Sequence, residues 1–168
     1  GRDNRGEVVL TRFLLQALNK INPDYSEMVI TSAIDELVRD RSAMSSIATN
    51  EQVYKLIRDG IKVTTNDEGE EDTVTVKVID WNNIKNNHFI LCSQLFITGE
   101  IETRRPDLIS FVNGLPLVFI ELKASHRQLI HAYRDNLKDY RDTIPQLFWY
   151  NQLIILSNGI QSKVGTIS

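Results

Sequence analysis

Cysteine is almost absent from this sequence of 168 residues, in which Cys92 stands alone. A single thiol cannot close a disulfide within the chain, and its apolar neighbours favour a small core residue over a nucleophile. We therefore expect a protein of a reducing compartment, the cytoplasm. The few histidines are scattered and show no zinc-ligand spacing; they are His88, His126 and His131.

Long hydrophobic runs and targeting segments are also missing. No apolar run approaches the length that spans a bilayer, and no signal-peptide pattern opens the chain. The phosphate-binding motif G-x-x-x-x-G-K-[ST] does not occur, so we expect no ATP binding within this chain. Internal repeats and low-complexity linkers are lacking as well. The sequence predicts a globular domain without a membrane segment or a nucleotide-driven motor.

Positive charge is not in excess, because the net charge is −3. This balance argues mildly against a nucleic-acid partner, since proteins that bind DNA gain affinity by releasing its counterions. Much of the negative charge is local, however. Residues 67–72 have the sequence DEGEED, for which we expect an exposed hairpin tip. A domain that cleaves DNA also needs carboxylates for a metal, so the charge alone does not exclude one.

The hydrophobic periodicity changes at about residue 60, and this divides the chain into two parts of one domain. Residues 1–60 predict a mainly helical part, with helices over 8–21, from Asp24 to about Arg39, and over 51–59 between Asn50 and Gly60. Residues 61–168 predict a sheet-containing core. Its expected strands are 61–65, 74–80, 89–97, 108–112, 115–122, 153–156 and 162–167. We expect an α/β or α+β fold with a mixed sheet of about five or six strands flanked by helices.

The stretch RPDLISFVNGLPLVFIELK, residues 105–123, predicts a hairpin at the centre of this core. Its two strands are apolar at odd and even positions alike, so we expect both faces of the hairpin to be covered. Charged residues nevertheless stand at its open end, namely Asp107, Glu121 and Lys123. Only a loop of three residues before Leu115 would bring Asp107 and Glu121 to the same face. A loop of two residues would separate them.

Those three charged residues are the ones that a metal-dependent hydrolase needs. Two neighbouring carboxylates repel each other unless a divalent cation lies between them, and oxygen ligands suit Mg²⁺, or Mn²⁺ in its place. A lysine beside such a metal can orient the attacking water and stabilise a phosphate. The alternative is an ordinary Glu-x-Lys at a strand end. The hairpin and the upstream Pro106-Asp107 favour the metal site over it.

After Lys123 we expect a helix from about His126 to Arg141. A basic stripe follows one side of it at Arg127, His131, Arg134, Lys138 and Arg141. The stripe is typical either of a solvated face of mixed charge or of a helix laid along a phosphate backbone. Asn136 and Tyr140 fall on the opposite, inward face of the same helix.

The residues quoted for the hairpin resemble the PD-(D/E)xK nuclease superfamily. More narrowly, residues 105–123 and 135–159 are similar to the amino-terminal nuclease domain of the R subunit of type I restriction enzymes. Residues 21–44 and the VIDWNN segment at 78–83 resemble that family too, so the similarity covers most of the chain. The combination is specific, whereas the superfamily triplet alone is not.

The resemblance implies a restriction-endonuclease-like fold and the cleavage of DNA phosphodiester bonds. Asp107, Glu121 and Lys123 would be catalytic, and the carbonyl of Leu122 would join the two carboxylates on the metal. Arg104 and Arg105 would contact phosphate. If the basic stripe lies along a phosphate backbone, Arg127, Arg134 and Lys138 would add further contacts. The expected partners are double-stranded DNA and the specificity and methylation subunits. ATP would act only through motor domains that are absent from this chain. The expected location is the cytoplasm of a bacterium or archaeon.

One position departs from the family pattern. Related nucleases carry Gln-x-x-x-Tyr on the helix after the lysine, whereas this chain has NLKDY, with Asn136 in place of the glutamine and Tyr140 retained. Both residues are expected to support the metal site. The alternative function is a catalytically silent module that binds DNA or docks other subunits. The retention of Asp107, Glu121 and Lys123 together favours the nuclease.

Overall fold

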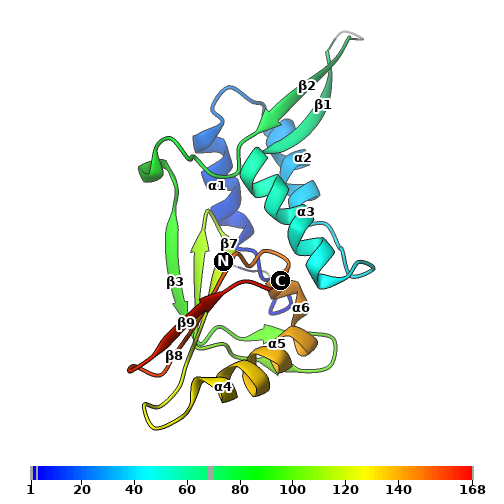
Figure 1. The fold of residues 1–168 in the computed structure, drawn as a ribbon. Helices are drawn as coiled ribbons and strands as arrows, with labels where there is room; N and C mark the ends of the chain where they lie inside the picture. The colour runs from blue at the N-terminus through cyan, green and yellow to red at the C-terminus, as the bar shows by residue number, and fades with distance from the viewer. Residues whose placement is uncertain (1, 3, 68–69, 168) are drawn as a thin grey trace.

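The chain is described by a computed structural model that covers all residues except 1, 3, 68–69 and 168, and leaves out the side chains of 67, 70, 131, 132, 134 and 135 (Figure 1). It opens with three helices, α1 (Thr11–Ile21), α2 (Glu27–Val38) and α3 (Ser46–Asp59). Each buries an apolar stripe, including Leu14 and Leu18 of α1 and Leu37 of α2. The predicted helical part is confirmed.

The helix boundaries differ from the prediction for a physical reason. The side chain of Ser26 caps α2, where Asp24 was expected. Ser45 caps α3 by accepting a 3.3 Å hydrogen bond from the N–H of Ala48, so this helix begins earlier than predicted. Asn50 is therefore not a cap. Gly60 ends α3 as expected, with a positive φ of 88°.

A hairpin of β1 (Ile61–Asp67) and β2 (Glu70–Val76) follows and projects from the body of the molecule (Figure 1). The short helix η1 (Ile84–Asn86) then leads to the main sheet. Its strands are β3 (Phe89–Ser93), β6 (Leu108–Val112), β7 (Leu115–Leu122), β8 (Leu153–Ser157) and β9 (Ser162–Gly165), in the order β3-β6-β7-β8-β9. Only the β7–β8 pair is parallel, so the sheet is mixed, as predicted.

The single strand predicted over 89–97 is broken into two. Gln94 has a positive φ of 51°, which turns the chain out of β3. The chain then forms β4 (Ile97–Thr98), which pairs with β5 (Thr103–Arg104) in a separate small sheet. The N–H of Gln94 donates to the carbonyl of Asp107 at 2.8 Å, so the break lies beside the start of β6.

The connection from β7 to the parallel β8 is helical but not one regular helix. It consists of α4 (Leu129–His131), the π-helical turn η2 (Ala132–Leu137), α5 (Lys138–Thr143) and α6 (Pro145–Phe148). α5 ends at Thr143, just before Pro145, and Pro145 occupies the first position of the short α6. This crossover packs on the sheet through Phe148, whose ring lies 5.4 Å from that of Phe119 on β7.

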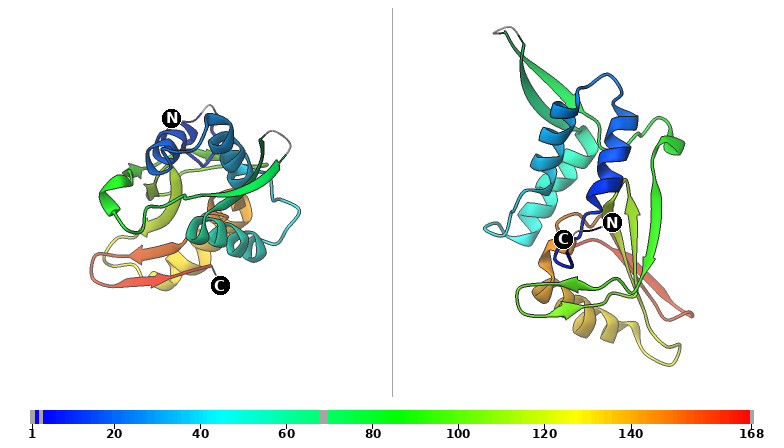
Figure 2. Two further views of the ribbon diagram at one scale, coloured as in Figure 1. Left: turned by 90° about the horizontal axis from the view of Figure 1, so that it is seen from above. Right: turned by 180° about the vertical axis from the view of Figure 1, so that it is seen from behind.

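The helices gather on one side of the main sheet (Figure 2). The side chains of β6, β7 and β8 that point to that side are almost completely buried, among them Ile109, Phe111, Phe119, Ile154 and Leu156. We call this the inner face of the sheet. No helix in the described part of the chain is long and apolar enough to cross a membrane.

Candidate active site

The central hairpin brings Asp107 and Glu121 to one face by a route that differs from the prediction. Its loop is the two-residue Asn113-Gly114, since Val112 pairs with Leu115, so the three-residue loop was wrong. A β-bulge then shifts the register by one residue, and Leu108 pairs with Ile120. Continued by one residue, this register sets Asp107 opposite Glu121. The bulge therefore adds the one extra residue on β7 that a three-residue loop was expected to provide.

The turn itself is held firmly against the helical part. Asn113 and Gly114 both have positive φ values, 52° and 84°, as a tight type I′ hairpin turn requires. A Cβ at Gly114 would lie 2.5 Å from the carbonyl oxygen of Leu10, because that residue's N–H donates to the carbonyl of Gly114 at 2.8 Å. The start of α1 thus fixes the hairpin that carries the charged residues.

Glu121 is the most unusual of these residues, because it is a carboxylate only 2% exposed. Its Oε1 atom accepts hydrogen bonds from Asn136 Nδ2 at 2.6 Å and from Lys123 Nζ at 3.2 Å. Its Oε2 atom is buried without a hydrogen-bond partner among the described residues. Burial raises the pKa of Glu121, and the negative charge of Asp107 raises it further, against the opposing effects of Asn136 and Lys123.

Asp107 and Lys123 lie at the same, open end of the hairpin, just before β6 and just after β7. Asp107 is half-buried, and its Oδ2 atom accepts a 2.8 Å hydrogen bond from the N–H of Leu122. The N–H of Lys123 donates to the carbonyl of Ser157 on β8 at 2.8 Å, so the parallel pairing fixes its backbone. The Lys123 side chain is 19% exposed, which leaves it accessible from one side. The three charged residues therefore converge at one end of the sheet.

The crossover helices complete this site from the inner face. Asn136 lies in η2 and reaches Glu121 although it is shorter than the glutamine of the family pattern. Tyr140 on α5 packs edge-on against Phe119, with ring centroids 5.5 Å apart. Burial raises the pKa of Tyr140 to about 12, with the charges of Glu121 and Asp107 contributing next. The Tyr140 hydroxyl therefore lies close enough to both carboxylates for their negative charges to disfavour its ionisation.

The donor set fits a hard divalent cation. In the described part of the chain, no cluster of three or more histidine, cysteine, aspartate or glutamate side chains is placed to hold a metal. Two carboxylates are available, however, and one of them has a buried oxygen with no hydrogen-bond partner among the residues that the structure describes. Backbone carbonyls and water would have to complete the coordination shell, as is usual for Mg²⁺.

Comparison with known proteins decides the family. The family described as "Type I restriction enzyme R protein N terminus" matches residues 1–168, the whole chain. The chain belongs to this family.

Several curated relatives of the family support the assignment. The HindI endonuclease subunit of a type I restriction enzyme from Haemophilus influenzae is 36% identical over an alignment that covers 100% of this chain and 16% of the relative. The putative MjaIXP endonuclease subunit from Methanocaldococcus jannaschii is 29% identical, with 98% of this chain and 16% of the relative covered. The chain thus spans about one sixth of the length of these relatives.

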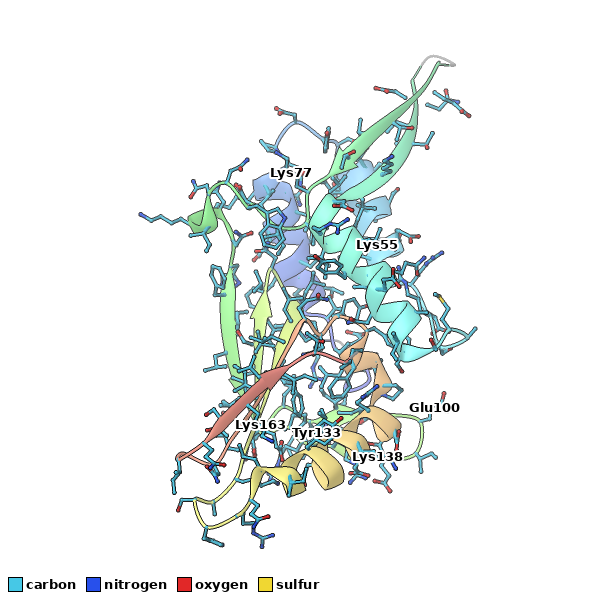
Figure 3. The ribbon with its side chains drawn as sticks, in the orientation of Figure 1. Lys55, Lys77, Glu100, Tyr133, Lys138 and Lys163 are labelled. Atoms are coloured by element: carbon cyan, nitrogen blue, oxygen red, sulfur yellow. The ribbon has the colours of Figure 1, made fainter. Side chains whose placement is uncertain are left out.

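The basic stripe predicted after Lys123 does not lie along one regular α-helix. Arg127 precedes α4 instead of lying on a helix, and the π-helical turn breaks the regular spacing that the stripe assumed. The side chain of Arg134 lies outside the described residues. Lys138 is exposed and lines, with Tyr133, Leu137 and Arg141 among others, a cavity of about 610 Å³ (Figure 3).

The two arginines before Asp107 have different environments. Arg104 is engaged within the protein: it forms ion pairs with Glu102 and Asp139, the latter at 2.8 Å, and bonds to Thr143. Arg105 is exposed, and its guanidinium lies 5.5 Å from the ring centre of Phe96. Arg105 is therefore the freer of the two for a phosphate.

Two features of the site were missed from the sequence. One is the carboxylate of Asp139, which neutralises Arg104. The other is Phe96, which is 45% exposed and carries Arg105 on one side and Arg5 at 5.3 Å. An interruption of the apolar run at Ser93-Gln94 was the available signal that the chain leaves the sheet before Phe96.

Proposed function

We propose that this chain is the metal-dependent endonuclease domain of a type I restriction R subunit and hydrolyses DNA phosphodiester bonds. The observation that carries the proposal is the environment of Glu121. A carboxylate is buried beside a second carboxylate, its Oε1 atom is held by Asn136 and Lys123, and its Oε2 atom has no partner among the described residues. Such a group is costly unless a cation completes it.

Asp107, Glu121 and the carbonyl of Leu122 would hold Mg²⁺, or Mn²⁺ in its place. When bound, the metal would supply a Lewis acid that lowers the pKa of a coordinated water and neutralises charge on the scissile phosphate. Glu121 meets a specific requirement of this role. The bonds from Asn136 and Lys123 fall on Oε1, so Oε2 is left for the metal without any rotation of the carboxylate.

The protein's own residues would do the rest of the chemistry. Lys123 would donate from Nζ to the attacking water or to a phosphate oxygen, and so stabilise charge that develops in the transition state. Asn136 would fix the Glu121 carboxylate in orientation through its 2.6 Å hydrogen bond. Tyr140 stays protonated at neutral pH, since its pKa is about 12, so its hydroxyl can serve as a donor beside the carboxylates.

DNA would approach from the exposed side of Lys123, steered by basic residues around the site. Arg105, Arg127, Arg134 and Lys138 are proposed phosphate contacts. Arg104 would contribute only by exchanging its ion pair with Asp139 for a phosphate. In the whole R subunit, the ATP-driven motor and the specificity and methylation subunits would deliver the DNA.

The deciding experiment is Mg²⁺-dependent nicking of DNA by a full-length R subunit that contains this chain, assembled with its partner subunits. Wild type is compared with Lys123→Ala, and Lys77→Ala serves as the control because Lys77 is exposed at the opposite end of the molecule (Figure 3). We expect loss of nicking only in Lys123→Ala. Calcium titration should still detect binding in that variant, because both carboxylates remain.

Two results would count against this function. Full nicking by Lys123→Ala would remove the lysine from the mechanism. Full nicking by Asp107→Ala would place the nuclease elsewhere in the complex, and would leave this domain as a silent module that binds DNA or docks other subunits.

A further inference from the structure

The main sheet has a second face that the described chain leaves open. Strand pairing places outward-pointing residues of neighbouring strands side by side, as in the row Leu91, Ser110, Val118 and Leu153 from β3, β6, β7 and β8. We call these positions the outer face. Those that are exposed or half-buried are Phe89, Leu91, Ser93, Leu108, Ser110, Val112, Val118, Ile120, Leu122, Leu153, Ile155, Ser157, Ser162 and Val164.

The composition of the outer face is that of a buried surface. Ten of these fourteen residues are apolar, the other four are serines, and none is charged. An antiparallel sheet with one face in water normally alternates apolar and polar side chains. Here the exposed fractions reach 56% for Phe89, 61% for Leu91 and 65% for Val164. Contiguous apolar surface of this kind marks an interaction site.

The sequence and the structure disagree at this surface. Both strands of the central hairpin are apolar at odd and even positions, which predicts two covered faces. The helices of the described chain lie on the inner face only (Figure 2). Something outside the described residues must therefore account for the apolar residues of the outer face.

We propose that the outer face docks an apolar segment from the remaining polypeptide of the R subunit. The relatives provide the reason for this occupant, since the matched region is 16% of their length and most of each relative lies outside it. DNA is a poor occupant, because the outer face carries no cation to pair with phosphate. This inference does not depend on the nuclease proposal, because it uses the opposite side of the sheet from Glu121.

Cysteine labelling in a full-length R subunit containing this chain tests the proposal. Leu91→Cys and Val164→Cys report on the outer face, and Met28→Cys and Ile47→Cys are matched controls on α2 and α3, with natural exposures of 72% and 54%. The native cysteines, including Cys92, are replaced in the background. We expect the outer-face thiols to react about tenfold or more slowly than the controls, because docked surface is protected until it opens.

The competing occupants give different results, and each would overturn the proposal. Equal labelling at all four positions would mean that the outer face is free. Protection that disappears on dilution of the R subunit would indicate a second copy. Protection that appears only after the specificity and methylation subunits are added would assign the outer face to them. Protection in the isolated R subunit, independent of its concentration, supports docking within one polypeptide.

Discussion

The two ends of the central hairpin both bury a polar side chain, but they treat it in opposite ways. At the turn, Asn113 is fully buried and its amide group is completely used: Nδ2 donates to the carbonyl of Val78 and to Asn87, and Oδ1 accepts from the N–H of His88. At the open end, Glu121 is almost as deeply buried, yet one oxygen has no partner among the described residues.

If Glu121 holds a metal as proposed, this difference separates a structural polar group from a functional one. A satisfied buried amide stabilises a unique packing, because any rearrangement would leave its partners unpaired. An unsatisfied buried carboxylate opposes folding, so it persists where a ligand completes it. The comparison predicts that changes at the two ends have opposite consequences for activity and stability.

The largest effect should come from Glu121→Gln. Nicking should fall about a thousandfold or more, because a neutral amide is a poor metal ligand and cannot balance the charge of the reaction centre. Stability of the metal-free protein should be unchanged or higher, since a desolvated charge is removed. Nicking assays and thermal unfolding of the same preparation measure both. A large loss of stability would mean that Glu121 is structural, like Asn113.

Asn113→Ala should show the reverse pattern. The change leaves the buried carbonyl of Val78 and the N–H of His88 unpaired, so we expect a loss of about 2–4 kcal/mol in the free energy of unfolding. Nicking per folded molecule should stay within about twofold of wild type at a temperature where the variant remains folded. Denaturant titration gives the stability. Unchanged stability would contradict the structural role of this amide.

Asn136→Ala should have an intermediate effect on catalysis. Without its 2.6 Å hydrogen bond, the Glu121 carboxylate is free to rotate, and we expect about a 10–100-fold loss of metal affinity or nicking. Asn136→Gln restores the family residue and is the matched comparison. If the π-helical turn positions the shorter side chain specifically, the glutamine should also reduce nicking. Full activity of both variants would limit Asn136 to packing.

The smallest effect concerns pH. The folded-state pKa of Glu121 is raised by burial and by Asp107, so the folded protein holds its proton to higher pH than the unfolded chain does. Stability of the metal-free protein should therefore fall as the pH rises from the unfolded pKa through the folded one. Glu121→Gln should lack this contribution to the slope. The measurement is thermal unfolding of wild type and Glu121→Gln across that pH range, with EDTA present. Equal dependence of stability on pH in the two proteins would mean that the pKa of Glu121 is not raised by folding.

The sequence predicted the turn end of the hairpin better than the open end. Asn-Gly between two apolar runs specifies a tight turn by backbone sterics, which are local. The β-bulge was not predicted, although Pro116 was a usable signal, because proline lacks the N–H of a regular ladder and occurs at bulges. The prediction that Asp107 and Glu121 can share one face was therefore correct, but the shift in register comes from the bulge and not from a three-residue loop.

The site also depends on geometry that a sequence pattern does not hold. Asn136, which contacts Glu121, lies in a π-helical turn, whereas helical periodicity assumes a regular α-helix. The same assumption produced the basic stripe, which the structure breaks at Arg127. The pairing of Arg104 with Asp139 depends on tertiary packing of β5 on α5, which local propensity cannot predict.

One small contact restricts how this chain can fold during synthesis. The side chain of Asn50, on α3, donates to the carbonyls of Phe148, Trp149 and Asn151, residues 98 to 101 positions later in the chain. The helical part leaves the ribosome first, but these hydrogen bonds cannot form until residues 148–151 have also emerged. Until then, α3 lacks the hydrogen bonds that join it to the end of the crossover, the segment that also carries Asn136 and Tyr140. The contact of Asn136 with Glu121 and the contacts of Asn50 therefore depend on the same late segment of the chain.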